Sequence, residues 1–307
     1  MADMTINDFI EELKQKEIEI TFSEGKLKYK GPEEYITPEL IEQLRNFKGK
    51  LIKYFWPSEC GNLMPINPSG SRTPLFIIHG DNGNYIISEH FGPDQPVFGF
   101  FHPGSEGEEI GFKSVNYMAR VYLERLRLVY PEGPVYLIGF SFGGLLAYEM
   151  AVQLQLSGRN VPFLVIIDSI CPSAHEAVKW HKSIYKIVRK NILGPLRRKI
   201  ERGIKSLICE SYIFFKKPIP IERRNFYMVN KYLTLGKRYR PTVFNGNILL
   251  FRTTENPSSY KYIGWETLVS EIKMFEIEGR HLEIFIGKTR VDILCKEIEN
   301  HLNHVVV

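Results

Sequence analysis

A serine among glycines is the residue whose surroundings best fit nucleophilic chemistry. Residues 139–144 read Gly-Phe-Ser-Phe-Gly-Gly, which puts Ser141 at the centre of a G-x-S-x-G motif. The apolar run 135–138 precedes the motif and the amphipathic run 145–156 follows it, an order that predicts strand, sharp turn and helix. Small neighbours would allow the strained turn that holds the serine hydroxyl out for attack. The alternative is a serine that only caps a helix, but the flanking pattern favours a nucleophile.

A serine hydroxyl is a weak nucleophile until a base takes its proton, and His281 is the best candidate for that base. In chains with this motif, the acid and then the histidine follow the serine. Three of the eight histidines precede Ser141, two lie in the C-terminal tail and two fall in an apparent insertion. His281 instead follows the strand-like run 271–277 and precedes a predicted helix over about 288–302.

Two carboxylates compete to orient His281. Asp168 directly continues the apolar run 164–167, whereas Glu255 follows the run 248–251 in the polar sequence Thr-Thr-Glu-Asn-Pro. Both positions are carboxyl ends of predicted strands, the edge at which α/β sheets form their sites. An unpaired charge at the end of a buried strand would be costly, so we expect Asp168 to pair with the imidazolium. Asp168 is therefore the predicted acid and Glu255 the alternative.

Acyl transfer at Ser141 would also need two backbone N–H groups that hold the oxyanion of a tetrahedral intermediate. Phe142, the residue after the nucleophile, supplies one candidate. The loop 79–84 follows the apolar run 75–78 and is rich in residues that tolerate unusual φ/ψ angles. We predict the main-chain N–H of Asp81 as the second donor, with its side chain turned away from the developing charge. The alternative is an ordinary glycine-rich turn.

Three stretches, 63–70, 131–150 and 279–281, carry a resemblance that extends over nearly all of the last 245 residues. They resemble the type I thioesterase domains that end nonribosomal peptide synthetases and polyketide synthases, members of the α/β-hydrolase superfamily. The resemblance implies an α/β-hydrolase fold with a mostly parallel sheet and a helical lid. It also implies transfer of an acyl or peptidyl chain from a carrier-protein phosphopantetheine to Ser141. Water or an internal nucleophile would then release the chain, by hydrolysis or cyclisation.

The resemblance also bears on the acid. In type I domains the acid follows the strand directly after the nucleophile helix, which favours Asp168, whereas stand-alone editing (type II) thioesterases usually place it after the following strand, where Glu255 lies. The implied catalytic residues are Ser141, Asp168 and His281, with no metal and no cofactor beyond the substrate's own phosphopantetheine. Asp81 departs from the family, in which an apolar residue is commoner. The alternatives are an editing thioesterase that removes stalled acyl groups, or a non-catalytic scaffold of a synthetase complex.

Residues 1–56 read as a separate unit with the order helix, hairpin, helix. Residues 5–8 form a capping box before a short amphipathic helix. The runs 18–22 and 27–29 alternate as paired strands do, with a glycine in the turn between them. Thr-Pro-Glu-Leu at 37–40 starts a second helix with an N-cap threonine followed by proline.

This small αββα unit resembles the N-terminal docking domain of the tubulysin-synthetase type. Such domains bind the acidic C-terminal tail of the upstream synthetase subunit along a hairpin edge. Lys26, Lys28 and Lys30 fit that role because alternate positions of a strand share one face. The alternative is a solvated basic strand face.

Positive charge concentrates in the segment between Asp168 and the next predicted strand. Residues 179–240 contain 18 Lys and Arg and three acids, a net charge of +15, although the whole chain carries only +5. We predict a helical lid over about 172–240 whose charge steers an acidic carrier protein and its phosphopantetheine phosphate. The alternatives are attraction to a membrane or nucleic acid, or a solvated lid without a partner.

Length and composition fit a two-part chain. The 307 residues exceed one average domain, and 44% hydrophobic residues are ample for a core. We predict a docking domain over 1–56, a proline-rich linker over 57–74 and a thioesterase domain over 75–307.

The chain has no apolar run of about 18 residues, and its first residues lack the charged region of a signal peptide. We therefore expect a cytoplasmic location, with neither stable membrane insertion nor nucleic-acid binding. The four cysteines are far apart and follow no metal-binding spacing, so we expect reduced thiols.

Overall fold

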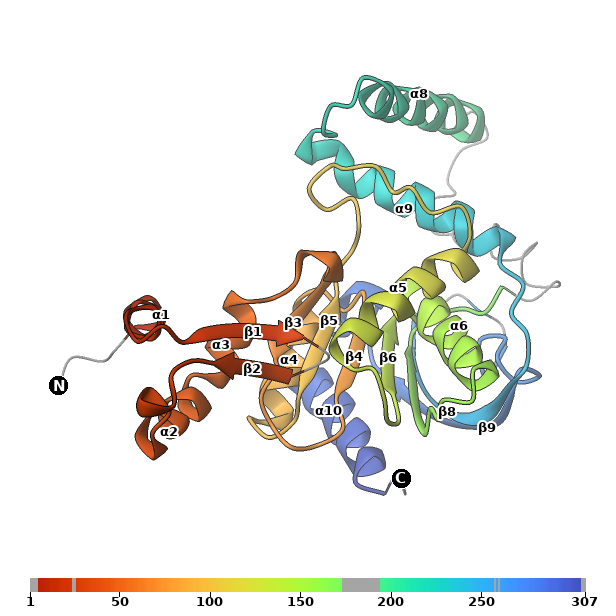
Figure 1. The fold of residues 1–307 in the computed structure, drawn as a ribbon. Helices are drawn as coiled ribbons and strands as arrows, with labels where there is room; N and C mark the ends of the chain where they lie inside the picture. The colour runs from red at the N-terminus through yellow and green to blue at the C-terminus, as the bar shows by residue number, and fades with distance from the viewer. Residues whose placement is uncertain (1–4, 24–25, 173–193, 257, 259, 305–307) are drawn as a thin grey trace.

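A seven-stranded sheet forms the centre of the structure, a computed structural model that describes residues 5–23, 26–172, 194–256, 258 and 260–304 (Figure 1). The strand order is β3-β5-β4-β6-β7-β8-β9. The first strand of the sheet pairs antiparallel with its neighbour, and every other pair is parallel. The strands are β3 (Leu63–Asn67), β4 (Leu75–Ile78), β5 (Val97–Phe100), β6 (Tyr136–Phe140), β7 (Phe163–Ile167), β8 (Phe244–Thr253) and β9 (Val269–Ile277).

Helices cover both faces of this sheet because its central strands are apolar on both sides. In β4, Leu75 and Ile77 join one buried cluster, while Phe76 and Ile78 join the other. This division follows from the period of two in a strand. The first cluster packs under α4 (Asn82–Phe91) and α10 (Lys288–Leu302), and the second packs under α5 (Val115–Val129) and α6 (Phe142–Leu156). The predicted mostly parallel α/β architecture is confirmed.

Two long helices, α8 (Gly194–Phe214) and α9 (Ile221–Arg238), lie between β7 and β8 in the chain. Figure 1 shows them projecting away from the sheet, above the helices of one face. They belong to the segment 172–240 that the charge pattern predicts as a helical lid. The first part of that lid, residues 173–193, lies outside the described residues.

The N-terminal unit contains the predicted helix and hairpin, followed by a helix in two parts. The capping box at Thr5 is present, and Thr37 caps the second helix by accepting from the Leu40 N–H. That helix is interrupted at Phe47, whose ring stacks on Phe9 at 4.7 Å. The elements are α1 (Ile6–Gln15), β1 (Glu19–Ser23), β2 (Lys26–Lys30), α2 (Pro38–Asn46) and α3 (Lys48–Tyr54).

Trp56 connects this unit to the sheet. Its ring stacks on Phe22 of the hairpin at 5.4 Å and on Phe98 of β5 at 5.8 Å, and its Nε1 donates to the Leu63 carbonyl at 2.8 Å. Part of the segment predicted as a linker, 57–74, forms β3, the edge strand of the sheet. Its proline-rich sequence is compatible with a strand here, since an edge strand tolerates proline.

All four cysteines are buried and none forms a disulfide. Among the described residues, no helix is both long enough and apolar enough to cross a membrane. The same part of the chain contains no group of three His, Cys, Asp or Glu side chains arranged to hold a metal ion.

Candidate active site

Ser141 lies in a sharp turn between β6 and α6. Its φ of 54° and ψ of −123° are a strained conformation for a residue with a side chain. Two hydrogen bonds hold the turn: the Ser141 N–H donates to the Ile167 carbonyl at 2.9 Å, and its own carbonyl accepts from Gly144 at 3.0 Å. Glycine is required nearby, because a Cβ at Gly139 would lie 2.3 Å from the Gly143 carbonyl oxygen. The motif thus forms the predicted strand, turn and helix.

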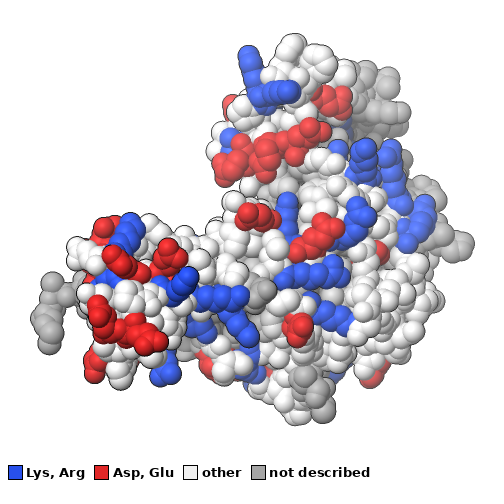
Figure 2. All heavy atoms as spheres, in the orientation of Figure 1, with Lys and Arg blue, Asp and Glu red and all other residues white. Residues whose placement is uncertain are grey.

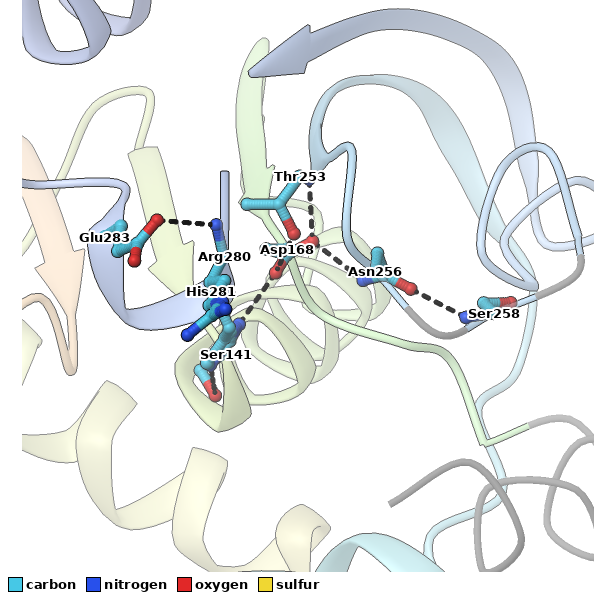
Figure 3. Close-up of polar contacts among 8 residues, drawn as sticks. All are labelled: Ser141, Asp168, Thr253, Asn256, Ser258, Arg280, His281 and Glu283. Carbon is cyan, nitrogen blue, oxygen red and sulfur yellow. Dashed lines mark hydrogen bonds and ion pairs between the residues drawn. The ribbon is translucent and has the colours of Figure 1, made fainter. Parts of the chain in front are cut away.

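His281 lies between the serine and the acid that the sequence predicts (Figure 3). Its Nε2 is 2.8 Å from Ser141 Oγ, and its Nδ1 is 2.7 Å from Asp168 Oδ2. A carboxylate only accepts hydrogen bonds, so Nδ1 carries the proton of the neutral ring. Nε2 is then free to accept from the serine hydroxyl. The imidazole is also stacked on Phe140, with ring centres 4.8 Å apart.

Asp168 directly follows β7 and is almost fully buried, with 1% of its side chain exposed. Burial is the largest single influence on its pKa and raises it, but hydrogen bonds from His281, Thr253 and Asn256 together outweigh burial and lower the pKa below its ordinary value. The carboxylate is therefore ionised at neutral pH, as an acid that orients an imidazolium must be.

Two residues that the sequence reasoning did not single out hold this carboxylate. Thr253 donates to it twice, from its N–H at 3.0 Å and from its hydroxyl at 2.9 Å, and Asn256 donates its amide at 2.7 Å. The Asn256 oxygen in turn accepts from the Ser258 N–H at 3.0 Å (Figure 3). The sequence signal available for both residues was their position shortly after the apolar run 248–251, at the carboxyl end of a predicted strand.

Glu255, the alternative acid, lies in the same turn but faces a different partner. Its Oε2 is 3.2 Å from Nε of Arg280, and both side chains are more than half exposed. Of the two carboxylates that the sequence offered, the one hydrogen-bonded to His281 is Asp168.

The two predicted oxyanion donors lie in the turns that follow neighbouring strands. Asp81 is the N-cap of α4, three residues after the end of β4, and Phe142 is the first residue of α6, two residues after the end of β6. Strands β4 and β6 are paired in parallel, so both turns lie at the same edge of the sheet. N–H groups in the first turn of a helix have no partner within that helix and can serve a ligand.

Helix α9, in the segment predicted as a lid, touches this edge through Tyr232. Its ring stacks on Phe142 with centres 4.6 Å apart and planes 13° apart, and its hydroxyl donates to the Pro103 carbonyl at 3.1 Å. Figure 2 shows both acidic and basic side chains over the described lid and the chain beside it. One pair that joins them is Arg224 with Glu106, at 3.6 Å.

The three predicted docking lysines lie on β2, with their residues exposed. The register places Lys26 opposite Ser23, Lys28 opposite Thr21 and Lys30 opposite Glu19. On the face seen in Figure 2, acidic and basic side chains are mixed over the N-terminal unit.

Comparison with known families identifies both parts of the chain. Residues 6–56 match the TubC N-terminal docking domain, and residues 86–184 match the thioesterase domain.

Relatives of known sequence are much longer proteins. Malpibaldin synthetase of Mortierella alpina is 30% identical over 231 residues, which are 72% of this chain and 4% of the relative. A dimodular nonribosomal peptide synthase of Bacillus subtilis strain 168 is 29% identical over 241 residues, again 72% of this chain and 10% of the relative. The chain therefore spans a small part of the length of these relatives.

Solved structures with the same fold include thioesterases of two kinds. The NocB thioesterase domain of the nocardicin cluster is 19% identical, with a TM-score of 0.56 over 79% of this chain and 99% of that domain. The type II thioesterase BorB of the borrelidin cluster is 16% identical, with a TM-score of 0.54 over 78% of this chain and 96% of that protein. The chain thus combines a TubC-type N-terminal docking domain with a thioesterase domain of the kind found in nonribosomal peptide and polyketide synthetases.

Proposed function

We propose that this chain is a serine thioesterase that releases an acyl or peptidyl chain from the phosphopantetheine thioester of a carrier protein. The observation that carries the proposal is the hydrogen-bonded series at the sheet edge. His281 lies 2.8 Å from Ser141 Oγ and 2.7 Å from a buried, ionised Asp168. This is the relation that nucleophile, base and orienting acid need for acyl transfer.

In the first half-reaction, Ser141 Oγ attacks the thioester carbonyl as its proton passes to His281 Nε2. The negative charge that develops on the carbonyl oxygen is held by the N–H groups of Asp81 and Phe142. Asp168 accepts from Nδ1 and stabilises the imidazolium. Collapse of the tetrahedral intermediate breaks the C–S bond, and the phosphopantetheine sulfur takes the proton from His281 as it leaves.

In the second half-reaction, an incoming nucleophile attacks the acyl-serine ester. His281 Nε2 removes a proton from water or from a hydroxyl or amine of the bound chain, and returns it to Ser141 Oγ as the ester C–O bond breaks. Water gives a free acid and an internal group gives a ring. The phosphopantetheine belongs to the carrier protein, so this sequence of steps uses only side chains and backbone of the enzyme.

The substrate is delivered by two interactions. The net positive charge of segment 179–240 attracts an acidic carrier protein and the phosphate of its phosphopantetheine. The N-terminal unit binds the acidic C-terminal tail of an upstream synthetase subunit along β2, through Lys26, Lys28 and Lys30. Such a contact raises the local concentration of the loaded carrier near Ser141.

The experiment that tests this function is active-serine labelling combined with turnover. The full chain is treated with a fluorophosphonate probe, and the labelled residue is located by mass spectrometry. Hydrolysis of an acyl N-acetylcysteamine thioester is measured in parallel. Labelling of Ser141 with loss of turnover supports the enzyme. A folded protein that neither reacts nor turns over would instead be a scaffold.

The mode of release is decided by the product. When the upstream subunit loads its own carrier, mass analysis distinguishes a free acid from a ring, which is lighter by one water. Release of full-length chains supports a terminating thioesterase. Preferential removal of short acyl groups from misloaded carriers would support the editing alternative.

A further inference from the structure

The carboxylate of Asp81 has a specific partner beside the proposed oxyanion hole. Asp81 Oδ2 lies 3.5 Å from His102 Nε2. The Asp81 side chain is 63% exposed, whereas the His102 side chain is only 21% exposed. The His102 ring packs against the rings of His79 and Tyr232. An acid at this position needs explanation, because a negative charge near a developing oxyanion would oppose the reaction that the N–H of the same residue assists.

The strand order indicates on which side of β4 Asp81 meets His102. In the strand order, β4 lies between β5 and β6. Asp81 follows β4 and Ser141 follows β6, whereas His102 follows β5, on the other side of β4. The contact with His102 therefore draws the Asp81 carboxylate toward β5, away from the side of the serine.

His102 is itself fixed by neighbours. Its Nδ1 lies 3.3 Å from the Tyr232 hydroxyl, and its ring centre is 4.1 Å from that of the fully buried His79. Tyr232 also stacks on Phe142, the residue of the other proposed oxyanion donor. One tyrosine of the lid helix α9 thus contacts both Phe142 and the histidine that pairs with Asp81.

The hydrogen-bond roles are set by the carboxylate. Because Asp81 can only accept, Nε2 of His102 must carry a hydrogen. The Tyr232 hydroxyl donates its single hydrogen to the Pro103 carbonyl, so its oxygen accepts from Nδ1 when the ring is charged and is only in contact with Nδ1 when the ring is neutral. The contact between Asp81 and His102 forms in both cases.

We infer that His102 is a positioning residue of the oxyanion hole, which holds the Asp81 carboxylate on the β5 side of the site and away from the oxyanion. The inference rests on the proposed function, because the penalty it describes arises only when negative charge develops beside the Asp81 N–H. Without His102, the Asp81 side chain would be free to rotate toward Ser141. This rotation would destabilise the transition state more than it would weaken substrate binding, so kcat would fall.

The test is a double-mutant cycle in the full chain, with acylation by a thioester followed in single turnovers. His102→Phe removes the donor while retaining a ring, and Asp81→Asn removes the negative charge. We expect His102→Phe to lower the acylation rate constant by about tenfold with the wild-type Asp81, and by less than about twofold when Asp81→Asn is also present. KM should change by less than about twofold in both backgrounds.

Equal losses in the two backgrounds would overturn the inference, because they would mean that His102 supports only the packing of the site. Thermal unfolding of each variant guards against misfolding, and His102→Leu replaces His102→Phe if the latter does not fold. An inactive wild type that no fluorophosphonate labels would overturn the proposed function and this inference together. An active wild type with equal losses would overturn this inference alone.

Discussion

Asp81 and Ser141 have nearly the same backbone conformation, with φ 47° and ψ −119° at the first and φ 54° and ψ −123° at the second. Each residue lies in the turn between a parallel strand and the helix that follows it, and the two strands, β4 and β6, are neighbours. A non-glycine residue with positive φ costs on the order of 1–3 kcal/mol and persists only where its surroundings enforce it. Strain of this kind is repeated at two adjacent turns of one sheet edge, where we propose the nucleophile and an oxyanion donor.

Replacement of the proposed nucleophile is expected to remove turnover while leaving the fold intact. Ser141→Ala should lower kcat by about 10⁴-fold or more, because the remaining N–H groups and substrate contacts supply only part of the acceleration. Ala retains a Cβ and so adds no steric change to the turn. Single-turnover kinetics with circular dichroism as a control measures both properties. A folded Ala variant with near-native activity would contradict the mechanism.

The two candidate acids should differ strongly in their effect. Asp168→Asn is expected to lower the acylation rate by about 10²- to 10⁴-fold, because the amide no longer selects the His281 tautomer or stabilises its charged form. Glu255→Gln should change the rate by less than about threefold. It breaks only an exposed ion pair with Arg280, and such pairs contribute roughly 0–1 kcal/mol. Equal or reversed effects would assign the acid to the later strand and favour the editing alternative.

The amide of Asn256 offers a test with a pH signature. Asn256→Asp keeps the shape but places a second carboxylate where the amide now donates to Asp168 at 2.7 Å. Two acids at this separation share a proton, which raises the pKa of the pair above that of Asp168 alone. As pH rises and the shared proton leaves, repulsion between the carboxylates grows, so activity relative to the wild type should fall.

The matched control is Asn256→Leu, which removes the hydrogen bond without adding a charge. Its activity relative to the wild type should be lowered by about three- to tenfold and should stay constant from pH 6 to 9. Profiles of kcat/KM against pH for the two variants make the comparison. Parallel profiles would mean that Asn256 does not influence the ionisation of Asp168.

Trp56 is expected to couple the stability of the N-terminal unit to that of the sheet. Its ring lies between Phe22 and Phe98, so Trp56→Ala should leave a cavity that costs about 2–4 kcal/mol. Calorimetry should record one unfolding transition for the wild type and two for Trp56→Ala, with the N-terminal unit unfolding at the lower temperature. Trp56→Phe, which keeps a ring, should retain one transition. Two transitions in the wild type would show that the units are independent.

The sequence was most informative where local signals determine structure. The elbow around Ser141, the N-caps at Thr5 and Thr37 and the strand ends at Asp168 could all be predicted, because turn residues and apolar runs specify them over short distances. The interruption at Phe47 was missed. The Phe47 ring stacks on Phe9 of another helix, a contact between distant residues that local signals do not specify.

Contacts between segments that are distant in the chain also could not be predicted from the sequence. The hydrogen bonds of Thr253 and Asn256 to Asp168 depend on β7 and β8 being neighbours. The contact of Asp81 with His102 likewise depends on β5 pairing with β4. A periodic pattern indicates that strands exist, but their order follows from the packing of the whole sheet. For the same reason, β3 was assigned to a linker although it forms the edge of that sheet.

The docking role of β2 predicts a binding defect that leaves the active site untouched. The variant in which Lys26, Lys28 and Lys30 are all replaced by Glu should bind the acidic C-terminal peptide of the upstream subunit at least about tenfold more weakly. Binding by the wild type should weaken as salt rises, because exposed charges are screened over about 10 Å at 0.1 M salt. Hydrolysis of a small thioester should be unchanged, since these lysines belong to the N-terminal hairpin.

A control of equal charge separates local docking from general attraction. Replacing the exposed Lys261, Lys273 and Lys288 by Glu changes the net charge by the same amount on the other unit. This control should bind the peptide within about twofold of the wild type. Release from the intact upstream synthetase should slow only in the β2 variant, and only at concentrations below the effective molarity that docking provides. Peptide binding is measured by calorimetry. Equal weakening in both variants, or no binding of the peptide by the wild type, would mean that β2 is an ordinary solvated edge strand without a docking role.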